Sequence, residues 1–598
     1  MFVDLDRNVV NRYCSRASLA TTARTSALVA CLLVCAVGNA EAAAANSATA
    51  KNTSAPARSA PVASDLDITK SVGQPFYSGQ VIPTPKRATY RDEHLVLLDG
   101  PKRITFCEPM FEYFGPARDL LMRLFNKRFD RYKALFAGTW KLPDKTQRLP
   151  VLFALASDPN AKYLLDRYGL HETARSLEPQ GYLLDIRPAG VLCAGKDNAG
   201  LVNGLASFLQ LLHVKDGRWV VRGASIVDAP TFTTRYTAEY SLGFADFFDW
   251  MMLYKYNGFA SCYPAMDWRG LSEGHKKAMA VIKDYIDTYQ TMTYMVEFHI
   301  GGRRHRAMDC GDPVDVERLL KTVTETLERS GARHIMLCYD DVRPKLQPHE
   351  KGRFKTPADA HGAVADRVYR RVQEIRPGAV VSFCTPYYQG FQHRRWRAGS
   401  ELREVGLRYL RDTRTWNPNL RIVWTGPVTE SLSITQKDID LYRAEIGPDR
   451  PLFHWDNTWH YHQPLRSFYA TYVQDFVHQC ADRTSYVNIN GTKPIGKFFA
   501  ATAIDYYWNP EGFDPKRSRQ QAVAQFMGLP AVPVAERFYR YRGDGYFYHF
   551  SRMANLSTFG AILRDLEKVS LDPDLPAYCW SAYDQVAKVQ KRPPHKPQ

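Results

Sequence analysis

The pattern of apolar and polar residues changes near residue 230. Beyond it, short apolar or aromatic stretches that end in polar or glycine-bearing residues alternate with amphipathic segments of helical spacing. One such helix is well marked, because Asp312 can cap its start, Pro313 fits its first turn and Gly331 can end it. The expected strands are TRYTAEYS, GFASCYP, TYMVEFHI, HIMLCYD, AVVSFC, LRIVWTG, PLFHWDN and TSYVNIN. Eight strands that alternate with helices over about 280 residues predict a (β/α)8 barrel in an α/β fold, although not every connecting segment is convincingly helical.

Two further regions flank the predicted barrel, which takes residues 229–515. Residues 76–228 mix short strands such as VLFALAS and GYLLDIRP with the helical GLVNGLASFLQLL, and predict a compact α/β domain. Residues 516–598 contain QQAVAQFMG and FGAILRDLEKV, and predict a helical C-terminal region. Residues 43–75 are rich in Ala, Ser, Thr and Pro, and predict a mobile linker.

Residues 1–42 have the layout of a secretory signal peptide. Arginines precede the apolar run Ala27–Val37 and small residues follow it, with cleavage expected near Ala40 or Ala42. The run is too short to span a bilayer comfortably, and no other stretch is apolar enough to do so. We therefore expect export to the periplasm or beyond and no stable membrane insertion, with an uncleaved anchor as the alternative.

Cysteine usage and charge narrow the class of protein. Three of the 11 cysteines lie in the leader. The other eight include no CxxC pair, and their number and spacing support neither a disulfide-dense scaffold nor structural zinc. One or two disulfides are compatible with this count. The formal net charge of +17 favours anionic partners such as acidic glycans, cell-wall polymers or membrane surfaces, or serves solubility alone. Nucleic acid is disfavoured by export and by the lack of a recognisable binding motif.

Polar and aromatic residues gather where the predicted barrel strands end. In a parallel barrel these carboxyl ends carry the reactive groups, because the loops after the strands converge there. Two carboxylates, amides and aromatic faces suit a neutral sugar, whose hydroxyls pair with the polar groups and whose apolar ring face stacks on aromatic rings. The residues concerned are Asp340 and Asp341, then Thr385, Tyr387 and Tyr388, then Trp424 and Thr425, then Trp455, Asp456 and Asn457, and lastly Asn488 and Asn490.

Each of these residue types also has a structural interpretation. Adjacent aspartates on a strand face opposite ways, but at the last residue of a strand the chain turns and both can reach one pocket; otherwise the pair closes a turn or caps a helix. Loop asparagines such as Asn457 and Asn490 often bond only to their own loops, and Trp455 and Tyr388 could be core aromatics.

Three histidines crowd the loop after the seventh strand and raise the question of a metal. Side-chain alternation points His454 away from Trp455, and no HExxH or comparable ligand spacing accompanies His460 and His462. We therefore expect neither a metal nor an organic cofactor.

The order of motifs resembles glycoside hydrolase family 84, the β-N-acetylglucosaminidases that include O-GlcNAc hydrolases. The motifs are CYDD, ADAHGAVADRVYRRV, SFCTPYY, IVWTGP, FHWDN and IDYYWNPEGFD, in that order. The preceding IPTPKRATY, PQGYLLDIRPAGVLCAGKDNAGLVNGLASFLQLL and VDAPTF resemble the α/β domain that often precedes such barrels and those of the related hexosaminidases. The likeness covers about residues 80 to 515, most of the chain after its leader.

The resemblance implies a substrate-assisted retaining mechanism, in which the sugar's acetamido oxygen attacks its own anomeric carbon to give an oxazoline. Asp340 would hold and polarise the acetamido N–H, and Asp341 would protonate the leaving oxygen and then activate water. Neighbouring carboxylates cannot both ionise freely, which agrees with one of them serving as the acid. The resemblance also assigns substrate-binding positions, which are Tyr388 beside the acetamido group, Trp455 as a pocket wall, Asn457 and Asn490 as amides on the sugar, and His462.

His462 marks a departure from the family. The family pattern has an aspartate there that holds the outer hydroxyls of the sugar. The lysine expected after Pro264 is also absent, since Ala265, Met266 and Asp267 come next, and the glycine-rich turn after the first strand reads EYSLGFAD. The residues that the family uses to cleave the glycosidic bond are kept, whereas the residues that determine its sugar specificity are changed. The sequence therefore defines the reaction type better than the substrate.

These observations predict an exported glycosidase that removes a terminal 2-acetamido sugar from a glycan or glycoconjugate. Two alternatives with the same fold are a barrel that binds glycan without cutting it and a glycosidase of altered sugar specificity. A third is a metal-dependent hydrolase built on Asp340 and the histidine loop.

Overall fold

The structure is a computed structural model that describes most of the chain after its first 78 residues. The described residues are 79–98, 105–106, 150–215, 218–238, 245–289, 291–302, 306–390, 401–429, 431, 433–457, 471–472, 480–487, 494–542, 556–570, 580 and 583–584. The predicted signal peptide and linker lie outside them, so export and the predicted domain limits stay predictions. None of the described helices is long and apolar enough to cross a membrane.

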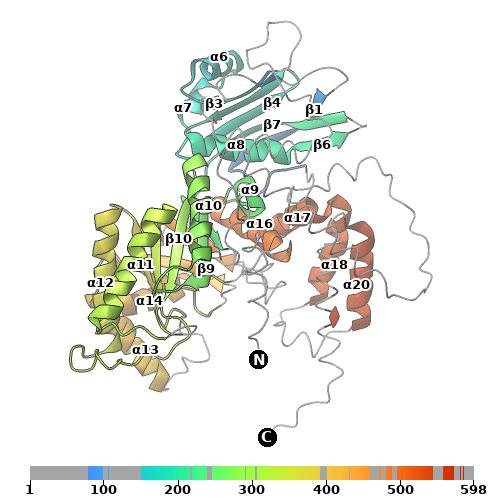
Figure 1. The fold of residues 1–598 in the computed structure, drawn as a ribbon. Helices are drawn as coiled ribbons and strands as arrows, with labels where there is room; N and C mark the ends of the chain where they lie inside the picture. Colours follow the sequence, from blue (N-terminus) through green and yellow to red (C-terminus); the bar gives the residue numbers. More distant parts are fainter. Residues whose placement is uncertain are drawn as a thin grey trace, which may run out of the picture. The chain divides into compact units, whose positions relative to one another are not determined.

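The first folded region is a mixed sheet with helices on both faces (Figure 1). Its strands run in the order β1-β7-β4-β5-β3-β2, with β6 also paired to β7. The strands are β1 (Arg87–Leu98), β2 (Thr105–Phe106), β3 (Pro150–Leu155), β4 (Tyr182–Arg187), β5 (Gly190–Gly195), β6 (Leu212–Lys215) and β7 (Arg218–Asp228). The helices are α6 (Pro159–Tyr168), α7 (His171–Arg175) and α8 (Asn198–Gln210). Alternate strand residues face opposite ways: Phe153 packs in the cluster that includes α8, and Leu152 in the cluster that includes α6 and α7.

The second region is a closed barrel of eight parallel strands. Around the barrel the order is β10-β11-β12-β13-β15-β17-β8-β9. The strands are β8 (Thr234–Ala238), β9 (Gly258–Met266), β10 (Thr293–His299), β11 (His334–Cys338), β12 (Val380–Cys384), β13 (Arg421–Trp424), β15 (Leu452–Asp456) and β17 (Cys480–Val487). Each overlaps one of the eight stretches expected from the sequence, so the predicted fold class is confirmed.

Helices come after most of the barrel strands. They are α9 (Ala245–Leu253), α10 (Glu273–Tyr289), α11 (Pro313–Ser330), α12 (Pro357–Ile375), α13 (Glu401–Asp412), α14 (Gln436–Ile446) and α16 (Pro494–Trp508), with a 3₁₀ turn at Thr413–Thr415. A two-stranded sheet of β14 (Ser433–Ile434) and β16 (Thr471–Tyr472) interrupts the pattern. Helix α11 is built as its sequence predicts, because the Asp312 carboxylate accepts from the backbone N–H of Val314 at 2.9 Å and Gly331 ends the helix at φ 68°.

The inside of the barrel is filled by side chains from alternate strand positions. One buried cluster holds them, and it contains Tyr236, Ala260, Met295, Met336, Cys338, Cys384, Tyr388, Val423, Phe453 and Trp455. The intervening residues point outward to the helices; Val381 and Phe383, for example, belong to the larger core. The interior of the barrel is therefore a packed core.

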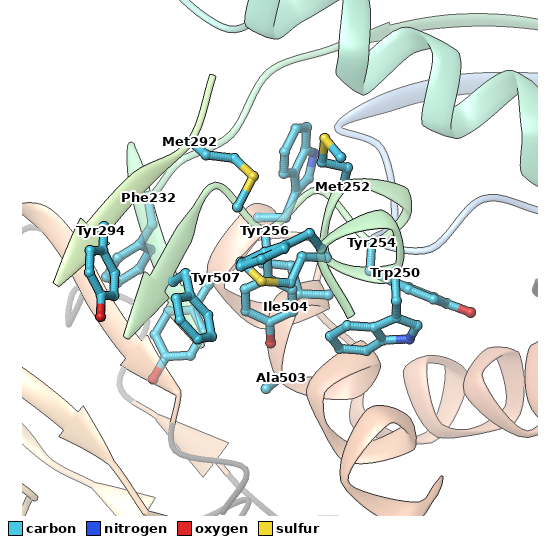
Figure 2. Close-up of a cluster of buried hydrophobic side chains, with 14 of the residues drawn as sticks. Phe232, Trp250, Met252, Tyr254, Tyr256, Met292, Tyr294, Ala503, Ile504 and Tyr507 are labelled. Atoms are coloured by element: carbon cyan, nitrogen blue, oxygen red, sulfur yellow. The ribbon is translucent and has the colours of Figure 1, made fainter. Parts of the chain in front are cut away.

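Part of the larger core lies beside α9 and α16. Figure 2 shows the aromatic side chains of Trp250, Tyr254 and Tyr256, from α9 and the turn after it, gathered with Ile504 and Tyr507 of α16. The rings of Trp250 and Tyr256 stack with centroids 5.9 Å apart. This cluster joins two segments that lie far apart in the sequence.

Asp228, the last residue of β7, ties the mixed sheet to the barrel. Its carboxylate accepts from Tyr182 Oη at 3.0 Å and from Trp508 Nε1 at 2.8 Å, and lies 3.6 Å from Lys255 Nζ. The side chains of Asp228 and Lys255 are fully buried. A sheet residue, a barrel residue and the last residue of α16 therefore meet at one carboxylate.

The C-terminal part is helical where it is described. Its helices are α17 (Pro515–Met527), the short 3₁₀ turn Leu529–Ala531, α18 (Val532–Arg542) and α20 (Leu556–Val569). QQAVAQFMG falls mainly within α17 and FGAILRDLEKV within α20, as the sequence predicts.

Candidate active site

The two adjacent aspartates lie just after β11, at the carboxyl end of the barrel. Asp340 continues the alternation of Met336 and Cys338, both in the interior cluster, and so faces into the barrel. Asp341 would face outward on a regular strand, but its backbone takes the left-handed conformation, with φ 55°. The turn brings the second carboxylate back to the same end of the barrel, because it contacts an interior residue, Tyr388.

Asp340 is held by a histidine that sequence reasoning missed. Its Oδ1 lies 2.7 Å from Nε2 of His299, the last residue of β10. The side chains are 13% and 6% exposed, respectively, so the hydrogen bond is largely shielded from water. A signal was present in the sequence, since His299 is the last residue but one of the stretch TYMVEFHI, and Asp340 ends HIMLCYD.

Asp341 is held by Tyr388. The phenolic O–H of Tyr388 donates to Oδ1 of Asp341 at 3.0 Å. Burial, together with the nearby charges of Asp341 and Asp340, raises the pKa of Tyr388 well above its ordinary value, so the phenol remains a donor. The tyrosine is fixed from the next strand, because the backbone N–H of Thr425 donates to its carbonyl oxygen at 3.0 Å.

The seventh barrel strand, β15, divides its residues between the two faces. Trp455 is 5% exposed and packs in the interior cluster with Tyr388, and the next residue but one, Asn457, is half-buried. Asp456 and His454 face outward instead, where Tyr507 Oη donates to Asp456 Oδ2 at 2.6 Å and lies 3.2 Å from His454 Nδ1. Burial lowers the pKa of His454 to about 4 and keeps its ring neutral.

Three of the strand-end residues considered in the sequence therefore do not face the candidate site. Asp456 bonds to α16, Trp424 stacks on Tyr442 of α14 with centroids 5.4 Å apart, and Tyr387 packs against Tyr409 of α13. Alternation explains each case, because all three lie one position away from an interior residue.

The described residues bring together four of the seven predicted site residues from three strands. Asp340, Asp341, Tyr388 and Trp455 lie at or just beneath one end of the barrel, and Asn457 lies two positions after Trp455. His462 and Asn490 lie outside the described residues, and so does Asn488. Their proposed roles stay predictions.

Asp267 lies in the segment after Pro264 where the family pattern has a lysine, and its carboxylate bonds to a neighbouring residue. Asp267, directly after Met266 at the end of β9, accepts from Nη2 of Arg269 at 2.7 Å and from its backbone N–H at 2.9 Å. The carboxylate thus takes part in its own turn. Met266 itself is fully buried.

One group near the acidic pair has the donor atoms of a metal site. Atoms of His299, Cys338 and Asp340 lie within 4.8 Å of one another. The histidine loop expected in the metal hypothesis does not contribute through His454, which faces the helix layer.

Solved structures share the fold of this chain, and two family models match parts of its sequence. "Structure of CpGH84B" is 15% identical, with a TM-score of 0.61 over 86% of this chain and 90% of that one. "Structure of CpGH84D" is 15% identical, with a TM-score of 0.54 over 86% and 88%. Residues 263–540 match the beta-N-acetylglucosaminidase family, and residues 79–229 match domain 2 of glycosyl hydrolase family 20. The chain is a family 84- and hexosaminidase-like protein.

The resemblance predicted from the motifs is thereby confirmed. A hexosaminidase-like fold of the family 20 and 84 type supports hydrolysis of N-acetylhexosamine glycosides. The match to the beta-N-acetylglucosaminidase family begins within β9 and spans the acidic pair, Tyr388 and Trp455. In this hexosaminidase-like barrel the acidic pair therefore stands where substrate chemistry is expected.

Proposed function

We propose that the protein removes a terminal 2-acetamido sugar by substrate-assisted retaining hydrolysis. One observation carries the proposal: two adjacent carboxylates share the carboxyl end of the barrel, yet each has a different partner. Asp340 bonds to His299 and Asp341 bonds to Tyr388. Two carboxyl groups with different surroundings can take the two different roles that the reaction needs.

Asp340 is suited to act on the acetamido group. His299 holds the Asp340 carboxylate through Oδ1, and in the proposed reaction this carboxylate accepts the acetamido N–H of the substrate. This contact increases the electron density on the acetamido oxygen, which attacks the anomeric carbon and expels the leaving oxygen. The product of this step is an oxazoline in its N-protonated form, and its N–H stays hydrogen-bonded to the same carboxylate.

Asp341 is suited to move the proton. Its carboxyl group gives a proton to the leaving oxygen in the first step and takes one from the attacking water in the second. Water adds to the anomeric carbon, the oxazoline ring opens, and the sugar leaves with its original anomeric configuration. Tyr388 donates to Oδ1 of Asp341 and so holds the carboxyl group at this end of the barrel.

The natural substrate is proposed to be a glycan or glycoconjugate outside the cytoplasm. The predicted signal peptide motivates this location, and the net charge of +17 favours an anionic carrier of the sugar. His462 stands where the family has the aspartate that holds the sugar's outer hydroxyls, and the family's lysine after Pro264 is absent. We therefore expect the 2-acetamido group to be required more strictly than the configuration of those hydroxyls.

The replaced positions also motivate a second candidate, a barrel that binds the sugar without cutting it. The two functions predict different affinities for a thiazoline that mimics the oxazoline. A working enzyme should bind the thiazoline far more tightly than the free sugar. Similar affinities for the two ligands would favour the binding protein.

The decisive experiment is hydrolysis of aryl glycosides with and without the 2-acetamido group. The parent should cleave only the acetamido forms. Asp340→Asn should lower kcat by about 100-fold or more with every leaving group, because the acetamido group is no longer polarised. Asp341→Asn should affect poor leaving groups most, since an activated phenol needs little protonation.

Asp366→Asn, on α12 and paired with Arg370, is the matched control and should keep parental activity. Equal turnover in the parent and both site variants would exclude the mechanism. Hydrolysis of glycosides that lack the acetamido group would exclude substrate assistance.

A further inference from the structure

Two neighbouring strands bring a histidine and a cysteine close to Asp340, the first residue of the acidic pair. His299 and Cys338 are paired residues of the parallel β10–β11 ladder, and Asp340 lies two positions further along. The imidazole, thiol and carboxylate atoms lie within 4.8 Å of one another. Cys338 is fully buried, and the His299 and Asp340 side chains are 6% and 13% exposed.

The next strand adds a second thiol. Cys384 is paired with Cys338 in the β11–β12 ladder, is fully buried, and forms a side-chain hydrogen bond with it. Both thiols are free cysteines. Glu297, two residues before His299 on the same face of β10, is buried and adds negative charge that reaches both thiols.

This set of donors selects one class of cation. Nitrogen, sulfur and a single carboxylate suit zinc and the softer cadmium, whereas magnesium and calcium prefer sites made of oxygen. Tetrahedral ligands about zinc lie roughly 3.3–3.8 Å apart, given bond lengths of about 2.0–2.3 Å. Only a small movement is needed, and Asp340 can supply it because it stands after the end of its strand.

We propose that a thiophilic divalent cation, zinc or cadmium, binds to His299, Cys338 and Asp340. Binding releases the Cys338 proton to solvent, moves the histidine proton to Nδ1, and forms metal–sulfur, metal–nitrogen and metal–oxygen bonds with no change of oxidation state. The cation occupies the carboxylate that the substrate's acetamido group needs, so it inhibits hydrolysis. This inhibitory consequence rests on the proposed function, whereas the cation site does not.

The test uses the reduced full-length protein and measures cation binding directly. Cadmium is titrated while its thiolate charge-transfer absorbance is recorded in the ultraviolet, and zinc binding is measured by equilibrium dialysis. The parent should bind one equivalent of either ion at this site, and Cys338→Ser should weaken binding at least about 10-fold because a hydroxyl is a poor ligand for these ions. Cys193→Ser changes a free, buried thiol of the mixed sheet and should bind as the parent does.

Inhibition supplies the second arm. Zinc should inhibit the parent competitively with substrate, a chelator should reverse the inhibition, and magnesium should have no effect. Relative to its own uninhibited turnover, Cys338→Ser should need at least about 10-fold more zinc than the parent for half inhibition, by the same loss of a ligand. Equal zinc sensitivity or equal cadmium absorbance in Cys338→Ser and the parent would overturn the proposal.

The two proposals fail in different ways. If the parent binds cadmium as expected but hydrolyses no 2-acetamido glycoside, the proposed function is wrong and the cation site stands. If the parent hydrolyses these glycosides but binds neither ion through Cys338, the cation site is wrong and the proposed function stands.

Discussion

Asp340 and Asp341 are the same residue type in different surroundings. One accepts from a buried imidazole of the preceding strand, and the other from a buried phenol of the next strand. A hydrogen bond to an ionised group is stronger than a neutral one and fixes the oxygen that it contacts. At the scale of single residues, the division of labour between the two acids thus comes from their neighbours.

His299 gives a prediction at this scale. His299→Ala removes the donor to Asp340 and should lower kcat roughly 10- to 100-fold, the equivalent of about 1.5–3 kcal/mol for a hydrogen bond to a charged group. KM should change less, because the contact acts on the reacting acetamido group. His299→Gln retains an N–H donor and should recover part of the loss. Steady-state kinetics on an aryl 2-acetamido glycoside measures both, and unchanged kcat in His299→Ala would contradict the role.

At the scale of elements, regular alternation made the barrel predictable. The eight strands are short apolar stretches with clear ends, and α11 has a capping aspartate, a first-turn proline and a terminal glycine in their expected places. Alternation also placed His454 away from Trp455 correctly.

Other strand ends obey the same alternation, although their residues were expected at the site. Asp456 and Trp424 turn outward, since each is adjacent to an interior residue. His299 was missed because a lone histidine in an apolar stretch has no distinctive spacing, and its partner Asp340 lies 41 positions further along the chain. Contacts between neighbouring strands depend on register, which the sequence of one strand does not contain.

The end of α11 gives a prediction about backbone conformation. Gly331 has φ 68°, and a Cβ added there would meet only Lys283 Cγ at 3.9 Å, so Gly331→Ala tests the conformation without a clash. The substitution should destabilise the fold by about 1 kcal/mol. Gly274→Ala, within α10 and also unobstructed, should stabilise it by about 0.5–1 kcal/mol. Urea unfolding of both variants checks the difference in sign, and a stabilising Gly331→Ala would contradict it.

At the scale of the whole molecule, Asp228 links the mixed sheet, the barrel and α16. Removing the charge of Asp228 alone would leave the buried ammonium of Lys255 without its carboxylate partner. Burial lowers the pKa of Lys255 to about 8 even with that carboxylate nearby. Breaking such a pair from one side costs about 3–5 kcal/mol.

We therefore expect Asp228→Asn to lower the unfolding midpoint strongly. The double variant Asp228→Asn with Lys255→Met should recover much of the loss, because the buried ammonium is then removed together with its carboxylate partner. Thermal unfolding at equal protein concentration measures both. A double variant less stable than the single one would show that the pair itself contributes the stability.

The buried histidines predict sensitivity to acid. Burial lowers the pKa of His361 to about 3 and that of His454 to about 4, whereas an unfolded chain protonates histidine near 6.5. The unfolded state therefore binds more protons as pH falls below about 6.5, and each histidine removes up to about 1.4 kcal/mol of stability per pH unit. Unfolding midpoints in urea at pH 7 and pH 5 should show the loss, and His454→Asn should reduce its slope; equal slopes in variant and parent would contradict this origin.

The left-handed backbone at Asp341 has a consequence for how its chemistry can be read. Among residues with a side chain beyond Cβ, aspartate and asparagine accept this conformation most readily, while most others add about 1 kcal/mol or more of strain. Asp341→Asn therefore keeps the left-handed turn of the backbone, and its kinetics report the loss of proton transfer alone. A truncation to alanine or an extension to glutamate perturbs the bend together with the acid, and its kinetics would mix the two effects.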